Sequence, residues 1–218
     1  MNTKVFYCLI TTFIFAASYT QGQFFEGTIT YKCSVTSPNQ EFNSFFPPSI
    51  VFTVRNDSIR KSEFSNGSQS PIYTQLLLGY KEYQIDYDTR QVRRVKYLDS
   101  MNYYEGGFKI ANFKRKKEST IINGYKCILY EYVDNNSKQS TIFWIDENFR
   151  FKRSSSQKLL LKEIGLVIKV EITSPNYSVE FVIDRIDLNK IHKKDFEFPA
   201  NFRWSEFYPQ SNFSQGKW

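Results

Sequence analysis

Apolar and polar residues alternate along much of the chain, in short runs bounded by turn-forming residues. In residues 25–35, Phe25, Ile29 and Tyr31 fall on one face, and polar side chains such as Lys32 fall on the other. A period of two residues is typical of a β-strand with one buried face. Comparable runs occupy residues 50–54, 59–64, 83–87, 92–98, 119–122, 125–133, 141–145, 149–153, 166–172 and 177–183. The pattern therefore predicts about ten strands.

The connections between these runs are short, as in an antiparallel sheet. Asn123-Gly124 favours a type I′ hairpin turn, and residues 146–148 and 174–176 also have turn composition. The arm after Gly124 is apolar on both faces, which is typical of a central strand. Helical patterns are weak, so residues 71–79 and 157–164 form short helices at most. We expect a mainly β protein built on one antiparallel sheet or barrel.

The first 22 residues have the features of a secretory signal peptide. Lys4 supplies the positive charge, and residues 5–17 form an apolar stretch too short to span a bilayer comfortably. Cleavage after Gly22 would leave residues 23–218 as a single domain with a loosely held tail after Trp204; cleavage near Ser18 and an uncleaved anchor helix are the alternatives. We expect an exported protein in the periplasm, with the cell surface and the extracellular medium as other possible locations.

Removal of the signal peptide would also remove Cys8 and leave two cysteines, Cys33 and Cys127. An even number of cysteines in an exported chain is compatible with a disulfide. Two buried free thiols are the alternative, and the sequence does not decide between them.

Aromatic residues make up 18% of the chain. This excess is typical of strands or of an aromatic-lined cavity. Apolar and aromatic side chains are also what small-molecule pockets contain. The alternative is that these rings only pack the core. Our candidates for a concave ligand-binding face are Phe52, Tyr83, Tyr87, Tyr130, Tyr132, Phe143, Trp144 and Phe181.

Basic residues exceed acidic ones, and the formal net charge is +7. Two basic segments would form one positive patch if they were neighbours in the sheet, and such a patch would suit an anionic membrane surface or an acidic protein. Export argues against nucleic acid as the partner, and a solvated strand face is the alternative. The patch would consist of Arg90, Arg93, Arg94, Lys96, Lys114, Arg115, Lys116 and Lys117.

The sequence offers little for catalysis. Its one histidine, His192, lies in a charged connection typical of the surface. Asp86 and Asp88 flank a tyrosine at a strand end, where aspartates are common. Nucleophile-elbow, phosphate-loop, Cys-x-x-Cys and His-Glu-x-x-His motifs are absent from the sequence. We therefore expect no catalytic residue, no metal site and no enzymatic activity.

Several segments, taken in order, resemble bacterial exported proteins with the LolA-like lipoprotein-carrier fold, near the GLPGLI-type envelope group. The resemblance lies in residues 25–31, 57–60, 122–127, 143–146 and 195–199. The Gly-Leu-Pro-Gly-Leu-Ile signature is missing, and residues 164–168 stand in its place. The resemblance implies a strongly curved, unclosed half-barrel whose concave face holds acyl chains, with no cofactor.

These observations suggest a non-catalytic envelope protein that binds a hydrophobic or lipidated ligand on the concave face of its sheet. The partner would then be a lipid or an acylated protein. The alternative is an accessory or structural subunit that binds another envelope protein without a small ligand.

Overall fold

The computed structural model describes residues 24–39, 43, 46–96, 112–132, 139–152 and 159–208. The predicted signal peptide lies outside these ranges. Within them, no helix is both long and apolar enough to cross a membrane. The described strands are β1 (Gly27–Thr36), β2 (Ser49–Arg55), β3 (Ser58–Phe64), β4 (Tyr73–Leu78), β5 (Lys81–Asp86), β6 (Gln91–Val95), β7 (Phe113–Ile122), β8 (Tyr125–Tyr132), β9 (Ser140–Asp146), β10 (Leu160–Leu161), β11 (Gly165–Ser174), β12 (Tyr177–Asp187) and β13 (Arg203–Phe207).

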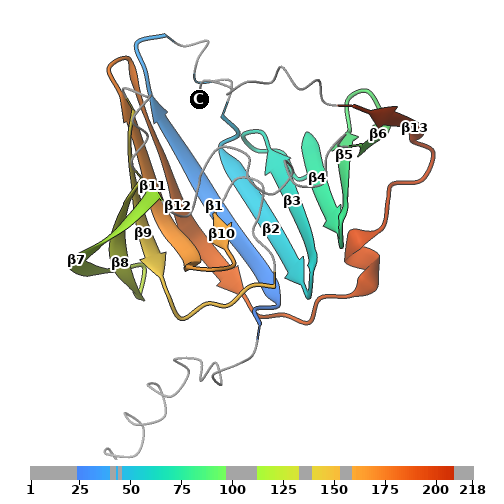
Figure 1. The fold of residues 1–218 in the computed structure, drawn as a ribbon. Coiled ribbons are helices and arrows are strands. Elements are labelled where there is room, and N and C mark those ends of the chain that lie inside the picture. Colours follow the sequence, from blue (N-terminus) through green and yellow to red (C-terminus); the bar gives the residue numbers. More distant parts are fainter. Residues whose placement is uncertain are drawn as a thin grey trace, which may run out of the picture.

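All thirteen described strands belong to one sheet, in the order β13-β6-β5-β4-β3-β2-β1-β12-β11-β9-β8-β7, with β10 paired to β11 (Figure 1). The pairs are antiparallel except β13 with β6, which is parallel. No pairing among the described residues joins the two edges, so the sheet is open. The predicted mainly β, unclosed antiparallel architecture is confirmed, with more strands than expected.

The short helix predicted for residues 71–79 is wrong, because this segment contains β4. Thr74, Gln75, Leu76 and Leu77 are all buried, so the strand shows no alternation that could be recognised in the sequence. Its neighbours explain the pattern, since Leu76 and Leu77 enter two different apolar clusters on opposite faces of the sheet.

The helix predicted for residues 157–164 and the strand predicted for residues 149–153 are also wrong where the chain is described. Residues 153–158 lie outside the described ranges. Residues 159–164 contain the two-residue strand β10 and a turn instead of a helix. Residues 149–152 are not a strand. They place Phe149 and Phe151 against Phe25, with ring centroids 5.7 Å apart in both pairs.

Residues directly opposite each other on neighbouring strands point to the same face of a sheet. We call the face that carries Tyr31, Phe52 and Phe143 the core face, because all three belong to the main buried cluster. Tyr31 lies opposite both Ile50 and Ile183, and its hydroxyl donates a 2.6 Å hydrogen bond to the carbonyl oxygen of Val167. The core face is thus continuous across β2, β1, β12 and β11.

The opposite face, which we call the reverse face, has a second apolar cluster over β4, β5 and β6. Leu76, Ile85 and Val92 pack there against Ile191 and against Phe196 of the 3-10 helix η2 (Lys193–Phe196). The guanidinium of Arg60 in β3 donates hydrogen bonds to the carbonyl oxygen of Asp195 (2.9 Å) and to the hydroxyl of Tyr87 (3.0 Å). These contacts attach the segment after β12 to the reverse face.

The segment after Trp204 is described as far as Tyr208. Within it, residues to Phe207 continue β13 beside β6. The backbone amide of Lys96 donates a 2.8 Å hydrogen bond to the carbonyl oxygen of Phe207.

The β7 end of the sheet is connected to the turn after β9 by one carboxylate. Glu147 accepts hydrogen bonds from Arg115 Nε (2.7 Å) and Nη2 (3.2 Å) and from the Tyr130 hydroxyl (2.6 Å). The hydrogen bond from Arg115 is the largest cause of the lowered pKa of Glu147. Glu147 therefore contacts both β7 and β8 in its charged form.

Gly165→Ala should destabilise the protein more than Gly124→Ala. Both glycines have positive φ, but only at Gly165 would an added Cβ lie 2.3 Å from the carbonyl oxygen of Asp146, whereas nothing lies within 4 Å at Gly124. Gly124→Ala should cost about 1–2 kcal/mol from backbone strain alone. Urea unfolding of both variants measures the difference, and equal losses would contradict the close approach at Gly165.

Glu147→Gln should lower the urea midpoint at pH 7 and lose this effect in acid. Because the folded-state pKa of Glu147 is lowered, its stabilisation is present above the unfolded pKa of about 4.3 and disappears as the pH falls through the folded value. Glu163→Gln, which removes the same charge from an exposed turn, is the control. If both variants behave alike across the pH range, the Arg115 and Tyr130 contacts contribute nothing.

Candidate functional site

Five of the eight aromatic residues predicted to form a ligand-binding face lie on the core face. Cross-strand register joins Tyr130, Phe143 and Phe181 in one row through Val170. Phe52 lies opposite Ile29, and Tyr132 lies opposite Thr141. Phe181 is partly buried, while the other four side chains are buried. Aromatic residues from strands far apart in the sequence therefore form one surface.

The other three predicted residues do not join this surface. Trp144 is one residue from Phe143 and so points to the reverse face, opposite Lys169 and Leu129. Tyr83 and Tyr87 pack on the second cluster, 4.8 Å from the Phe198 ring and 5.6 Å from the Phe202 ring, respectively. Their role in packing this cluster separates them from the aromatic surface of the core face.

Sequence reasoning missed other parts of the core face. Phe113 packs on Tyr132 and Phe143, with centroids 5.3 and 5.0 Å apart. Three consecutive leucines, residues 159–161, cover the centre of this face and are at most 3% exposed. The Tyr31 hydroxyl is 3.5 Å from the carbonyl oxygen of Leu159. We call the core-face residues of β1, β2, β8, β9, β11 and β12 the apolar half.

The core face becomes polar at β3. In one cross-strand row, Phe52 is followed by Lys61, Gln75, Gln84 and Arg93, and in the next row Ile50 is followed by Glu63, Tyr73, Asp86 and Gln91. A third row adds Glu82, opposite Leu77. We call these core-face residues of β3–β6 the polar half: Lys61, Glu63, Tyr73, Gln75, Glu82, Gln84, Asp86, Gln91 and Arg93.

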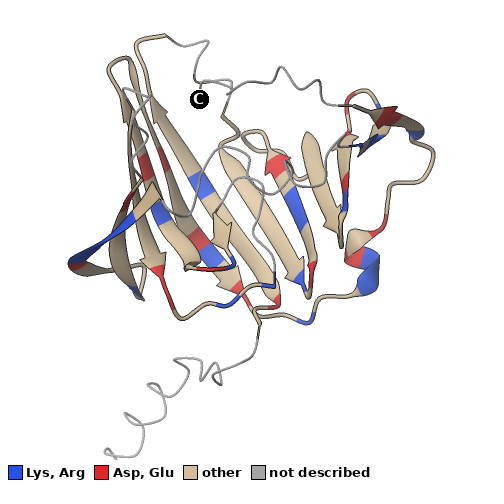
Figure 2. Ribbon diagram, viewed as in Figure 1, with Lys and Arg blue, Asp and Glu red and all other residues tan. Residues whose placement is uncertain are grey.

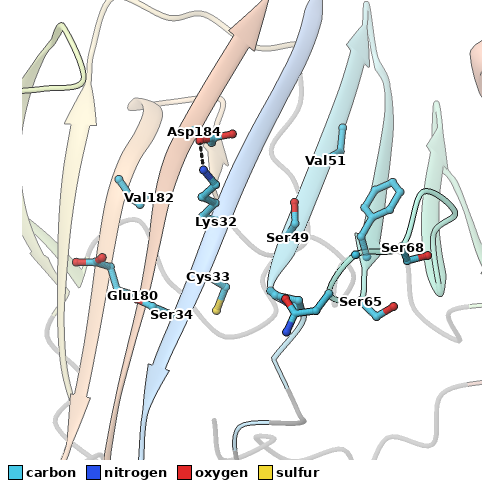
Figure 3. Close-up of a pocket in the computed structure, with 14 residues that line it drawn as sticks. Lys32, Cys33, Ser34, Ser49, Val51, Ser65, Ser68, Glu180, Val182 and Asp184 are labelled. Carbon is cyan, nitrogen blue, oxygen red and sulfur yellow. Dashed lines mark ion pairs between the residues drawn. The ribbon is translucent and has the colours of Figure 1, made fainter.

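A groove of about 720 Å³ lies on the reverse face, between β1, β12, β2 and the loop after β3 (Figure 3). Lys32 forms a 2.5 Å ion pair with Asp184 in this groove. Glu180 is paired with Lys169 at 2.6 Å. The lining also includes the aromatic ring of Phe64, and it includes hydroxyl groups and small apolar side chains, among them Ser34, Ser49, Val51, Ser65, Ser68 and Val182. The groove combines paired charges and hydroxyl groups with a larger apolar surface, and it has the volume of a small-molecule or peptide site.

The structure contains no disulfide between Cys33 and Cys127, and both are free thiols. Cys33 is in β1 and Cys127 in β8, with β12, β11 and β9 between them. Four strand spacings correspond to about 19 Å along the sheet, whereas a disulfide needs Cα atoms within about 7 Å. Burial raises the pKa of Cys33 to about 12 and that of Cys127 to about 11, so neither is an activated nucleophile.

The two basic segments do not form one patch. Arg90, Arg93, Arg94 and Lys96 lie in or beside β6, and residues 114–117 lie in β7, at the opposite end of the sheet (Figure 2). Several of these charges are paired with carboxylates, namely Lys96 with Glu206, Arg115 with Glu147 and Lys116 with Glu131. The prediction of one basic patch is wrong, because the distance between two segments along the sequence does not tell which strands are neighbours in the sheet.

The remaining titratable candidates have structural positions. His192 is exposed, and its backbone amide donates a 2.7 Å hydrogen bond to the Asp195 carboxylate at the start of η2. Asp86 accepts a 2.9 Å hydrogen bond from the Thr89 amide, which lowers its pKa. Among the described residues, no three His, Cys, Asp or Glu side chains gather as metal ligands.

Comparisons with known proteins give structural neighbours only. No protein-family model matches the sequence, and a search of curated proteins finds no match. Two crystal structures of PNGF-II, in space groups P21 and C2, are similar with a TM-score of 0.53, at 16% and 13% identity over 83% and 84% of this chain. The chain spans 31% of the length of these PNGF-II chains. At this identity the likeness shows the fold.

The similar structures also include a LolA superfamily protein and a mycobacterial lipoprotein. NE2245 from Nitrosomonas europaea has a TM-score of 0.37 at 9% identity, covering 79% of this chain and 90% of its own. The Mycobacterium tuberculosis lipoprotein LppX has a TM-score of 0.38 at 9% identity, covering 76% and 89%. Likenesses at these TM-scores carry no argument about this chain, so any function must be argued from its own residues. The relation to the GLPGLI-type group stays a prediction.

Proposed function

We propose that this protein binds a hydrophobic or lipidated ligand on the apolar half of the core face, as a non-catalytic exported protein of the cell envelope. One observation carries the proposal. Five of the predicted aromatic residues form a continuous surface with Tyr31 and Phe113, on an open sheet whose apolar half is covered, within the described ranges, by β10 and other short non-helical segments. A surface of this kind suits an acyl chain better than a polar substrate.

The ligand would take the place of the leucines at residues 159–161. These side chains are chemically similar to an acyl chain and already lie over the centre of the apolar half. Their backbone is attached to the sheet by a short pairing, Leu160 with Leu166 and Leu161 with Gly165. Each methylene transferred from water to this surface would contribute about 0.8 kcal/mol, less the cost of exposing the leucine surface that it displaces. Exchange of one apolar group for another makes the binding reversible.

The remaining features of the proposal follow from the sequence. The partner is a lipid or an acylated protein, and the ligand is bound without a cofactor or a chemical step. The predicted signal peptide at residues 1–22 would deliver residues 23–218 to the periplasm as a single β domain. The same export argues against a nucleic-acid partner.

The groove on the reverse face favours a second candidate function. A protein that used this groove, with its Lys32–Asp184 pair and serine hydroxyls, would act as an accessory subunit for another envelope protein. The two functions use opposite faces of the same strands, so variants of adjacent residues distinguish them.

Phe181→Ala should weaken binding of a fluorescent fatty-acid probe about tenfold, which corresponds to the loss of roughly 1.4 kcal/mol of apolar contact. Phe181 is on the core face and partly buried, whereas Val182 is on the reverse face and lines the groove. Val182→Ala should leave probe binding unchanged. Probe titration measures both variants, with urea midpoints as the folding check. Equal effects, or no binding by the unaltered protein, would contradict ligand binding on the core face.

A further inference from the structure

The two edge strands of the sheet differ in length and charge. β7 is ten residues long and β13 is five. No described strand pairs with the outer side of either, so each presents a free row of backbone N–H and C=O groups. β13 has one arginine and one glutamate, and the glutamate is already paired with Lys96. β7 is therefore the longer edge and the one with an excess of charge.

Four consecutive basic residues give β7 this charge. Two of them, Arg115 and Lys116, are paired with carboxylates of neighbouring segments. Lys114 and Lys117 are exposed and form no ion pair with any described residue. The one acidic residue of the strand is Glu118. Once the paired charges are set aside, two positive charges and one negative charge remain on β7.

The end of β7 near the hairpin turn has a different character. Residues 119–122 are two hydroxyl residues followed by two isoleucines, and they pair in regular register with β8. Ile121 is 72% exposed. Uncharged, β-branched residues on a free edge are a template for a further strand. Backbone pairing and an apolar contact are both available here.

The same strand is poorly suited to pairing with a second copy of itself. Its register with β8 is irregular between Arg115 and Ser119. Bulges and lysines on an edge strand both hinder the pairing of like edges, and the excess positive charge of two copies adds repulsion. A partner must therefore supply negative charge beside residues 114–117 and a strand beside residues 119–122.

An extended acidic segment of another protein meets both requirements. Its backbone supplies N–H and C=O groups for the free edge, and its carboxylates complement Lys114 and Lys117. An anionic membrane supplies negative charge but no ladder of hydrogen-bonding groups for residues 119–122. The charge and the free backbone together thus favour a protein segment over a lipid surface.

We propose that β7 is a docking edge for an extended segment of another protein, which adds to the sheet as an antiparallel strand. The uncharged, β-branched N-terminal part of the segment pairs along residues 119–122. Its acidic C-terminal part contacts Lys114 and Lys117. The docking edge differs from the proposed ligand surface and from the groove, because both of those lie on faces of the sheet.

Two synthetic peptides of ten residues, the length of β7, test the docking edge by fluorescence anisotropy. Both consist of threonine, valine and glutamate in equal amounts, with the glutamates in the C-terminal half of one peptide and in the N-terminal half of the other. We expect the first peptide to bind about tenfold more tightly, because only its order matches β7 in an antiparallel pairing.

Equal binding of the two peptides, tighter binding of the second, or binding of neither would overturn the proposal. Phosphatidylglycerol vesicles provide the comparison with a membrane. A protein that binds these vesicles and neither peptide would have lysines that serve a lipid surface instead of a protein segment.

Lys114→Gln/Lys117→Gln should weaken binding of the first peptide about tenfold, because two ion pairs are lost. Lys193→Gln/Lys194→Gln is the matched control, since it removes the same charge from two exposed lysines of η2. The control should leave peptide binding unchanged. Neither double variant should change binding of the fatty-acid probe, so this result is separate from the proposed function. Equal loss of peptide binding in the two double variants would overturn the docking edge.

Backbone pairing is tested by methylating alternate amide nitrogens in the N-terminal half of the first peptide. In an added strand, the N–H groups of alternate residues point toward β7 and the others point toward solvent. One of the two methylation patterns should therefore abolish binding, and the other should preserve most of it. If the two methylated peptides bind with the same affinity, the segment does not add as a strand.

Discussion

The alternation of side chains along a β-strand is the constraint on which the rest of this structure depends. Every residue of the sheet is assigned to one of two faces, and a shift by one position moves it to the other. Phe143 and Trp144 show the consequence, since one lies in the buried cluster of the core face and the other faces Lys169 on the reverse side. The aromatic surface exists because the register of β8, β9, β11 and β12 places their aromatic side chains on the same face of the sheet.

The face of the sheet that is apolar differs between the two ends of the sheet. From β8 to β2 the core face is apolar, and in β4–β6 the reverse face is apolar and is covered by the segment that contains η2. Arg60 connects β3 to that segment through Asp195 and Tyr87. The polar half of the core face is the counterpart of this arrangement, because most of the residues that β4–β6 place on the core face are polar, although Leu77 is an exception.

Local features were predictable from the sequence and long-range ones were not. The hairpin at Asn123-Gly124 is confirmed by the pairing of Ile122 with Tyr125, and the turn before Tyr177 by its pairing with Ser174. Both depend on a few adjacent residues. β4 was missed because its two faces are buried in different clusters, which removes the period of two.

The candidate site was predictable only in part, because it depends on long-range strand pairing. Five of eight aromatic residues share the core face, but which strands are neighbours depends on pairing across the whole chain. That pairing separates β6 from β7 and Cys33 from Cys127, and it brings Lys61 beside Phe52. A lysine and a glutamate in an alternating strand look solvent-exposed in the sequence, and only register shows that they continue an apolar surface.

Native mass spectrometry of the protein purified from its own compartment, followed by organic extraction, tests ligand binding on the core face most directly. We expect one bound amphiphile per chain that is released by organic solvent. A protein that is free of lipid, and that takes up none when mixed with phospholipid vesicles, would contradict the proposed function.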